Sequence, residues 1–417
     1  FIQLPGSGRQ VYNFNPGWRF FKGDIHGAES VDFDDRSWTI VSTPHTVELM
    51  PAEASGCRNY QGPAWYRKHF VLPAETKGKR VLIHFEAAMG KQVLYLNGKR
   101  IQEHVGGYLP FTLDLTTNGI QAGDSCLLAI FVDNSNDKSF PPGKPQYTLD
   151  FAYHGGIYRD VWMIAKSPVS ITDPLDSQTV AGGGVFVHFD KISEKSAQVY
   201  VNTELQNDNQ HTETVTVETT LTDADGKVIK RTSGKLSLKS GEKKIIRQQI
   251  EVKSPKLWSP DAPYLYKVQS RIKKGNQSID GGITRIGIRL AEFRGKDGFW
   301  LNGKPFVQLV GANRHQDFAY VGNALPNSQQ WRDAKRLRDA GCTIIRVAHY
   351  PQDPSFMDAC DELGMFVIVA TPGWQYWNKD VKFGELVHQN TREMIRRDRN
   401  HPVSYTHLRA HETKANL

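Results

Sequence analysis

The first 165 residues alternate apolar and polar positions in short runs that turn residues separate. Clear examples are the segments 64–70, 81–85 and 93–99, and the last of these contains an Asn97-Gly98 turn signal. A period of two indicates half-buried strands, and Asn-Gly between such runs is a strong hairpin signal. The pattern therefore predicts an antiparallel β-sandwich at the start of the chain.

From about residue 166 to 288 the same kind of run continues, for example at 197–201 and 214–221, with a turn signal at 223–226. The size of this region and the spacing of its strands predict a second, immunoglobulin-like sandwich. The aromatic and proline-rich stretch 257–266 is expected near the last strands of this sandwich.

The periodicity changes after about residue 295. A short buried strand is predicted at 306–310, and Ser328 is expected to cap a helix that Gly341 ends. The apolar side of this helix would carry Trp331, Ala334, Leu337 and Ala340. A further strand is predicted at 343–347.

A second helix is predicted directly after this strand. Asp353 supplies its N-cap, Pro354 its first turn and Gly364 its end. One face of this helix would carry Phe356, Cys360 and Leu363. The apolar run 365–370 is too short for a helix between such boundaries and predicts a parallel strand, and a third helix is expected at about 385–399.

Three successive β/α units imply a parallel sheet with helices outside, either a doubly wound fold or the start of a (β/α)8 barrel. The roughly 110 residues available here compare with the ~250 that a full barrel needs. The barrel interpretation therefore requires a second half of the domain.

Composition excludes some classes of protein. No run approaches the ~20 consecutive apolar residues that cross a bilayer, so no membrane span is expected, and the first residues do not form a charged and then apolar leader. The four cysteines show no short C-x-x-C spacing, which argues against a zinc ribbon or a dense disulfide framework and predicts buried thiols. They are Cys57, Cys126, Cys342 and Cys360.

The net charge of +8 comes in part from basic residues that alternate with Thr, Ser, Leu and Ile. These are Lys227, Lys230, Arg231, Lys235, Lys239, Lys243, Lys244 and Arg247. No aromatic residues interleave with them to stack bases, so the pattern predicts the solvent face of a β-sheet rather than a nucleic-acid groove.

The segment CTIIRVAHYPQDPSFMDACDELGMFVI, residues 342–368, resembles a signature stretch of glycoside hydrolase family 2. Upstream, GANRHQDF at 311–318 is similar to the family's segment after the first barrel strand, and DFAYHGGIYRDVWM at 150–163 resembles the end of its sugar-binding domain. With PGWQYW and RDRNHP, the combined pattern is most similar to β-galactosidases of Bacteroidetes type.

This resemblance implies an order of domains. Residues 1–165 would form a sugar-binding jelly-roll sandwich, 166–288 an immunoglobulin-like sandwich and 289–403 the first part of a TIM-barrel catalytic domain. Residues 404–417 contain no apolar run for a fourth strand and are expected to be a non-native tail in which Glu412 has no role.

The resemblance also implies a site at the carboxyl ends of the barrel strands, which is where Arg314-His315-Gln316-Asp317, Arg346 with His349, and Trp374-Gln375-Tyr376-Trp377 fall. Substrate-binding roles follow for Asp150, His315, Asp317, His349 and Trp374. Arg346 would lie against the nucleophilic carboxylate and keep it ionised.

Several of these roles have structural alternatives. Asp317 has a turn-capping role as an equal alternative, and the aromatic residues Trp374, Tyr376 and Trp377 would serve equally as rim packing or as a sugar platform, with packing favoured for Trp377. Asp150, on a loop of the first domain, would reach into the barrel and make the enzyme exo-acting. Glu362, on the second helix, is expected to be a solvated surface residue.

The family chemistry is retaining hydrolysis by two carboxylic groups ~5 Å apart. By resemblance both catalytic Glu residues lie beyond Asn400-His401-Pro402, so this chain would contain neither and is expected to be inactive. A complete parent would hydrolyse terminal β-D-galactosyl residues.

The sequence leaves alternatives open. One is a β-glucuronidase or another family 2 β-glycosidase, and another is a non-catalytic carbohydrate-binding module, which would have no use for Arg314, His315, Arg346 and His349 on barrel loops. By resemblance a Mg or Na ion would lie near the sugar, although no local ligand cluster marks it. A homo-oligomer remains open, and export of similar bacterial proteins favours a periplasmic or secreted location.

Overall fold

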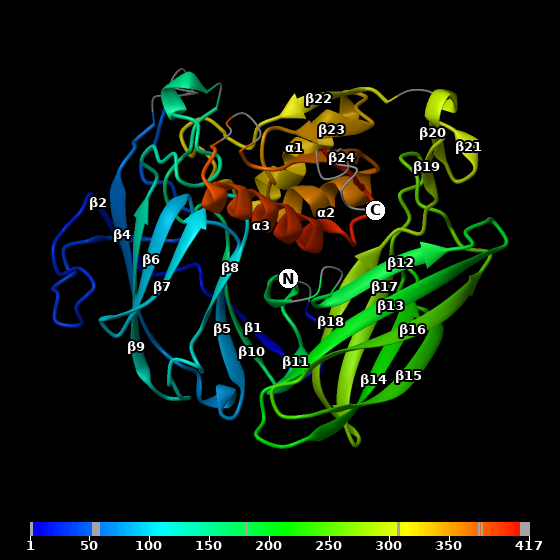
Figure 1. The fold of residues 1–417 in the computed structure, drawn as a ribbon, viewed down its shortest axis with the longest axis horizontal. Coiled ribbons are helices and arrows are strands. Elements are labelled where there is room, and N and C mark those ends of the chain that lie inside the picture. Colours follow the sequence, from blue (N-terminus) through cyan, green and yellow to red (C-terminus); the bar gives the residue numbers. More distant parts are fainter. Residues whose placement is uncertain are drawn as a thin grey trace.

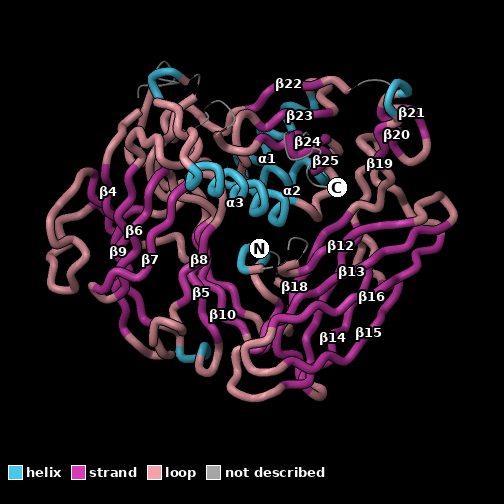
Figure 2. Tube along the Cα trace, in the orientation of Figure 1, coloured by secondary structure: helices cyan, strands magenta, loops and turns pink. Residues whose placement is uncertain are grey.

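The computed structural model describes residues 3–51, 59–149, 151–177, 179, 182–306, 309–373, 376 and 378–408. Figure 1 shows three units along the chain: a blue-to-cyan β-sandwich, a green β-sandwich, and a yellow-to-red α/β unit that lies across the top of both. Figure 2 shows that the longer helices all belong to this α/β unit. No helix among the described residues has the length and apolar character of a membrane span.

The first sandwich confirms the predicted antiparallel fold. Its strands are β1 (Gln10–Asn13), β2 (Trp18–Lys22), β3 (Thr39–Val41), β4 (Pro63–Val71), β5 (Arg80–Phe85), β6 (Gly90–Leu96), β7 (Lys99–Gly106), β8 (Phe111–Asp114), β9 (Ser125–Asp133) and β10 (Val161–Lys166). One sheet has the order β3-β2-β4-β9-β6-β7 and the other β1-β10-β5-β8. Apolar side chains from both sheets, Trp18, Ile83 and Ile130 among them, fill the space between them.

The second sandwich has the predicted immunoglobulin-like architecture. Its strands are β11 (Val169–Ile171), β12 (Val185–Asp190), β13 (Ser196–Asn207), β14 (Glu213–Thr222), β15 (Val228–Leu238), β16 (Lys243–Lys253), β17 (Tyr266–Lys274) and β18 (Gln277–Ile286). One sheet combines β11, β13, β12 and β16, and the other has the order β15-β14-β17-β18. The eight basic residues from Lys227 to Arg247 are all exposed, as expected.

The α/β unit is the first part of a TIM barrel. After a small sheet of β19 (Ala291–Phe293), β20 (Phe299–Leu301) and β21 (Lys304–Pro305) come the parallel strands β22 (Gly311–Arg314), β23 (Ile344–Val347), β24 (Phe366–Ala370) and β25 (Ser404–Leu408). The connecting helices are α1 (Asn327–Asp339), α2 (Pro354–Leu363) and α3 (Val381–Asp398). The strands follow each other in chain order, as in a barrel and unlike a doubly wound sheet, whose order reverses.

Short 3-10 helices complete the description. They are η2 (Ala74–Thr76), η3 (Gln146–Thr148), η4 (Pro174–Asp176) and η5 (Gly295–Asp297). The expected buried thiols are found at Cys126 and Cys360, whereas Cys342 is half-buried and Cys57 lies outside the described residues.

Helix α2 forms where its boundary residues predict it. The Asp353 carboxylate accepts a hydrogen bond from the Ser355 N–H at 2.8 Å, and Pro354 opens the first turn. Gly364 ends the helix in the left-handed region at φ 76°, and a Cβ there would also lie 2.3 Å from the Pro260 carbonyl oxygen. Both constraints require glycine.

The first barrel strand begins later than predicted. It is β22 rather than 306–310, of which 307–308 lie outside the described residues, and Leu309 and Val310 are exposed rather than buried. A Cβ at Gly311 would lie 1.7 Å from the Ile344 carbonyl oxygen. The absence of a side chain at Gly311 therefore lets the backbone approach β23 and start the strand.

The first helix also differs from its prediction. Pro326 occupies the N-cap position of α1, so Ser328 lies inside the helix and does not cap it. Trp331 and Ala340 are exposed, while Ala334 and the polar Gln330 are buried. Gln330 points inward because its side-chain oxygen accepts a hydrogen bond from Arg314 at 2.8 Å.

Two further corrections concern the end of the chain. Helix α3 begins at Val381 rather than 385 because the Asp380 carboxylate caps it, accepting from the Lys382 N–H at 2.9 Å. The expectation that no fourth strand follows Pro402 is wrong, because residues 404–408 pair in parallel with β24 as β25. Backbone hydrogen bonds to the edge of β24 provide this pairing, so no apolar run is required.

Candidate active site

Two of the predicted residues come together at the carboxyl ends of the barrel strands. His315 follows β22 and His349 follows β23, and their rings meet edge-to-face with centroids 5.2 Å apart. Both side chains are half-buried. The peptide bond between Ala348 and His349 is cis. This edge of the sheet, called the mouth below, is where a barrel carries its chemistry.

Arg346 lies inside the sheet close to the mouth. It is the third residue of β23, and its Nη1 donates to the Asn313 Oδ1 of β22 at 3.4 Å. A cavity of about 440 Å³ lies against this face. Its lining residues are Leu309, Gly311, Ala312, Asn313, Ile344, Arg346 and Ile368. Arg346 thus brings a guanidinium, which binds carboxylates in a forked geometry, to the wall of this cavity.

Arg314 does not belong to the mouth, contrary to the sequence-based prediction. Successive side chains of a strand point to opposite faces, and Asn313 already faces inward. Arg314 therefore points outward, where it pairs with Asp333 of α1 at 2.6 Å, bonds to Gln352, and lies 4.0 Å over the Phe356 ring of α2. Its role is to join the two helices to the sheet.

The first sandwich reaches the mouth through a loop between β9 and β10. Phe151 of this loop is buried, with its ring centroid 5.7 Å from that of His315 and 5.5 Å from that of His349. Asp150, predicted to bind the terminal sugar, lies outside the described residues. Its neighbour Phe151 nevertheless places this loop against both histidines.

Aromatic stacking joins the same two units beneath the mouth. Tyr108, between β7 and β8, stacks on Tyr350 with ring centroids 4.2 Å apart and an interplanar angle of 8°. Both side chains are fully buried, and burial raises the pKa of each phenol, so both stay neutral at ordinary pH. Tyr350 follows His349 directly, so the stack fixes the backbone next to that histidine.

Arg159 ties the first sandwich to both histidine loops. Its guanidinium is 1% exposed and donates to the Tyr108 carbonyl at 3.0 Å, the Gln316 side-chain oxygen at 3.0 Å and the Pro351 carbonyl at 2.9 Å. Gln316 is adjacent to His315, and Pro351 is two residues after His349. One buried side chain therefore positions both loops.

Asp317 lies where the barrel loop meets the first sandwich. Burial lowers the pKa of His154, and the nearby Asp317 carboxylate opposes this shift. The loop is close to His154 elsewhere too, because a Cβ at Gly322 would lie 2.5 Å from the His154 Nδ1. The observed neighbour of Asp317 is thus a buried imidazole of the first sandwich.

The loop after β24 also contacts the first sandwich. Trp374, Gln375 and Trp377 lie outside the described residues. Tyr376 packs edge-to-face on Phe383, with centroids 5.9 Å apart, and a Cβ at Gly143 would lie 2.7 Å from its ring. The contacts that Tyr376 makes here are packing contacts, and its role as a sugar platform stays a prediction.

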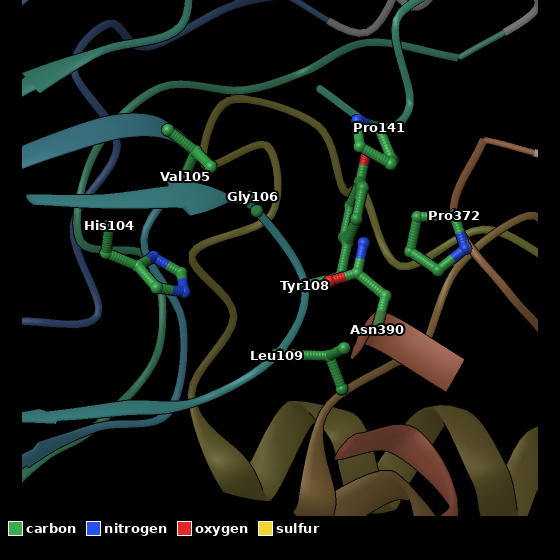
Figure 3. Close-up of a pocket in the computed structure, with 9 residues that line it drawn as sticks. His104, Val105, Gly106, Tyr108, Leu109, Pro141, Pro372 and Asn390 are labelled. Carbon is green, nitrogen blue, oxygen red and sulfur yellow. The ribbon is translucent and has the colours of Figure 1, made fainter. Parts of the chain in front are cut away.

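Figure 3 shows a small cavity at this junction, with Tyr108 and Pro141 of the first sandwich facing Pro372 and Asn390 of the barrel. Its volume of about 10 Å³ is the size of a single water molecule. A sugar ring does not fit there, so the larger cavity against β22, β23 and β24 is the better candidate site.

One group of potential metal ligands occurs among the described residues, at the opposite end of the barrel strands. Ligand atoms of Asp358, Asp361 and His401 all lie within 4.8 Å of one another. Arg285 contacts Asp358 at 2.5 Å, and the His401 Nδ1 lies 2.5 Å from the Asp361 Oδ2. These cations already balance the carboxylates, so the group does not fit a metal site, and an ion near the sugar stays a prediction.

The ion pair of His401 and Asp361 has an electrostatic consequence. Burial alone lowers the pKa of an imidazole, but the Asp361 carboxylate outweighs this effect and raises the pKa of His401 to about 9. The charged pair therefore persists at neutral pH and fixes the segment that enters β25.

The sequence singled out the histidines and Arg346, whose roles stay predictions, and gave no role to Arg159, Phe151 and Tyr108. Arg159 and Phe151 occur inside the motif DFAYHGGIYRDVWM, where only Asp150 received a role. An arginine in the same motif as a predicted site residue, here Arg159 near Asp150, is a signal that could have indicated a role in positioning the site. Tyr108 has no comparable local signal.

Models of three domains of one family match successive parts of the chain. The sugar binding domain of glycosyl hydrolases family 2 matches residues 28–168, a second family 2 domain matches 183–289, and the family's TIM barrel domain matches 293–404. The matches follow the order of the three structural units.

Individual relatives extend over nearly the whole chain. A β-galactosidase from Thermoanaerobacter pseudethanolicus is 36% identical over 95% of this chain and 51% of its own length. A β-glucuronidase from Formosa agariphila is 32% identical over 96% of this chain and 42% of its own length. The chain thus spans about half the length of these relatives.

Solved structures agree with these matches. Bacteroides uniformis β-glucuronidase 2, covalently bound to cyclophellitol-6-carboxylate aziridine, superposes with a TM-score of 0.85 and 32% identity over 95% of this chain and 46% of that one. Three matched domains in the family's order, together covering most of the sequence, show that the chain belongs to glycosyl hydrolases family 2.

Proposed function

We propose that the chain is the sugar-recognition half of a retaining exo-β-glycosidase that hydrolyses terminal β-D-galactosyl residues. The observation that supports this most directly is the convergence of His315, His349 and Phe151 at the strand ends, beside the cavity with Arg346. Side chains from two barrel loops and one sandwich loop meet there. A site to which loops of two domains contribute suits the end of a glycan.

The histidines would contact sugar oxygens that gain charge in the transition state. Asp150, Asp317 and Trp374 would contribute further contacts to the terminal sugar, with Asp150 reaching in beside Phe151. Arg346 would pair with the nucleophilic carboxylate and hold it ionised and oriented. The retaining mechanism needs two carboxylic groups ~5 Å apart, one as acid and one as nucleophile.

The residues that line the cavity include no carboxylate. We therefore expect this chain by itself not to hydrolyse an aryl β-galactoside. Turnover above that of a buffer blank by the purified chain would contradict this expectation.

Sugar recognition is testable on the chain itself. Titration calorimetry with galactonolactone, a flattened analogue of the galactosyl transition state, should show binding that is lost in His349→Ala. Lys304→Ala, at an exposed residue of β21, serves as a control that should bind as the unchanged chain does. A folded chain with no affinity for any sugar lactone would overturn the proposed site.

A second candidate is β-glucuronidase activity. It is favoured by the names of relatives such as the Formosa agariphila and Bacteroides uniformis proteins. A glucuronide carboxylate would require a cation or amide beside the sugar. Tighter binding of glucarolactone than of galactonolactone in the same titration would select this candidate.

Within a protein that carries both catalytic carboxylates, Arg346→Ala should lower kcat/KM by about 10²–10³-fold, because a positioned charge next to the reacting group would be lost. The effect should fall mainly on kcat rather than KM. An unchanged kcat would exclude Arg346 as the partner of the nucleophile.

A further inference from the structure

The whole net charge of the chain is concentrated in one short segment. Residues 227–256 contain ten Lys or Arg and two acidic residues, a difference of +8 that equals the formal net charge of all 417 residues. The basic residues are Lys227, Lys230, Arg231, Lys235, Lys239, Lys243, Lys244, Arg247, Lys253 and Lys256. The rest of the molecule is electrically neutral by the same count.

All ten of these side chains are exposed, and together they are called the basic strip. Most of them lie on β15 and β16, which stand at the edges of the two sheets of the second sandwich. Figure 1 shows these two strands along the outer side of that sandwich, away from β22, β23 and β24. At ~3.3 Å per residue, eleven-residue strands give the strip a length of roughly 35 Å.

Two carboxylates near the strip are engaged with lysines outside it. Glu213 is paired with Lys274 at 2.8 Å and Glu218 with Lys273 at 2.9 Å, both on β17. Arg231 reaches Glu218 only at 3.9 Å. The strip therefore produces a positive field that extends about a Debye length, ~8–10 Å, into the solvent.

We propose that the basic strip binds an anionic polysaccharide through its carboxylate or sulfate groups. Closely spaced lysines and arginines along two neighbouring strands fit charges repeated along an extended chain. Residues 227–256 contain no aromatic side chain, so the strip itself offers no ring on which bases or neutral sugars could stack. The field of the strip selects for charge rather than for a particular sugar.

The strip would hold the polymer while the mouth receives a chain end. Because the two surfaces are on one molecule, binding at the strip would raise the effective concentration of chain ends at the mouth. Polysaccharide binding at the strip is measured without turnover. A failure of this proposal can therefore be distinguished from a failure of the proposed hydrolysis.

Lysines on edge strands also discourage pairing with other chains. This role needs only a few charges along each edge and predicts no affinity for soluble polyanions. Binding experiments therefore separate the two explanations.

The test compares two variants with the same change of net charge. The strip variant combines Lys230→Gln, Lys235→Gln, Lys239→Gln and Lys244→Gln. The control variant combines Lys77→Gln, Lys99→Gln, Lys296→Gln and Lys304→Gln, all exposed and outside the strip. Affinity is measured at low ionic strength for heparin, which carries sulfates, for polygalacturonate, which carries carboxylates, and for neutral dextran and single-stranded DNA.

The unchanged chain should bind at least one acidic polysaccharide, and not dextran, with an affinity that falls steeply as salt is added. The strip variant should bind about tenfold more weakly or worse, and removing four of ten charges should reduce the salt slope by roughly two-fifths. The control variant should stay within about twofold of the unchanged chain. Binding of heparin alone or of polygalacturonate alone would tell sulfate from carboxylate recognition.

Three outcomes would overturn the proposal. One is the absence of binding to both acidic polysaccharides. Another is an equal loss in both variants, which would show a general effect of net charge. The third is tighter binding of DNA than of either polysaccharide, which would assign the strip to a nucleic acid.

Discussion

The barrel segment meets the two sandwiches in physically different ways. At its junction with the first sandwich the contacts are buried, with Arg159 and the stacked rings of Tyr108 and Tyr350 each about 1% exposed. At its junction with the second sandwich, Trp258 is buried against Phe366 and donates to the Asp361 carbonyl at 3.0 Å. The ion pairs of that junction are more open, because Arg285 pairs with Asp358 and Glu362, whose side chains are 43% and 42% exposed. Buried polar groups are costly to disrupt, whereas exposed ion pairs contribute little.

The two junctions also lie at opposite ends of the strands. The first lies beside the mouth, while the second includes Asn400, which exchanges hydrogen bonds with Val185 and Val187 of β12 just before the chain enters β25. Arg399 likewise donates to the carbonyls of Gly182 and Gly183. The first sandwich therefore borders the candidate site, whereas the second sandwich contacts the barrel at the opposite end of its strands.

The largest effect on stability is expected from Arg159→Ala. The change leaves the Gln316 oxygen and two carbonyls without a buried donor and removes the cation 3.9 Å from Asp353. We expect a loss of about 3–5 kcal/mol in the free energy of unfolding, measured in urea, together with loss of lactone binding. A loss below about 1 kcal/mol would show that the first junction is not the dominant one.

The next largest effect concerns the pH dependence of the pair of His401 and Asp361, which lies within the barrel segment next to the second junction. The folded pKa of His401, about 9, lies above its unfolded value of about 6.5. The stability from this pair is fully present below about pH 6.5 and is lost as the pH rises through about 9. Unfolding free energy should fall by about 3 kcal/mol across this window, and His401→Gln should flatten the dependence, while His388→Gln on the exposed face of α3 should not.

A smaller effect is expected from the stacked rings of the first junction. A double-mutant cycle with Tyr108→Leu and Tyr350→Leu should give a coupling of about 1 kcal/mol, because offset aromatic pairs contribute beyond their buried area. Urea unfolding of the four proteins gives this number. Additive losses would mean that each ring packs independently.

The smallest effect should come from Arg285→Ala. Its carboxylate partners are more than one-third exposed, so the expected loss is about 1 kcal/mol or less and should shrink further in high salt. Lactone binding should be unchanged. If binding fell as it does in Arg159→Ala, the division between a site-forming and a supporting junction would be wrong.

Local patterns predicted those elements whose signals are local. The ends of α2 followed from Asp353, Pro354 and Gly364, and the period-two runs predicted both sandwiches. His315 and His349 were found because parallel strands bring their carboxyl ends to one edge. Arg314 was misplaced because adjacent residues of a strand point to opposite faces, which no motif states.

Features that depend on distant partners were not predictable in this way. The stack of Tyr108 on Tyr350 and the bonds of Arg159 connect segments with no shared pattern. Strand β25 was missed because the edge of β24 supplies its partner. In each case the deciding interaction lies in the tertiary structure rather than in the residue itself.

The hydrogen bonds of Arg159 have a consequence for synthesis of the chain. Its acceptors in Gln316 and Pro351 lie 157 and 192 residues further along. At ~5–20 residues per second, roughly 10–40 s separate the translation of the guanidinium from that of its last acceptor. During that interval the Arg159 guanidinium must stay solvated on the surface of the first sandwich. The contacts that position the loops of the mouth can therefore form only after the ribosome has passed His349.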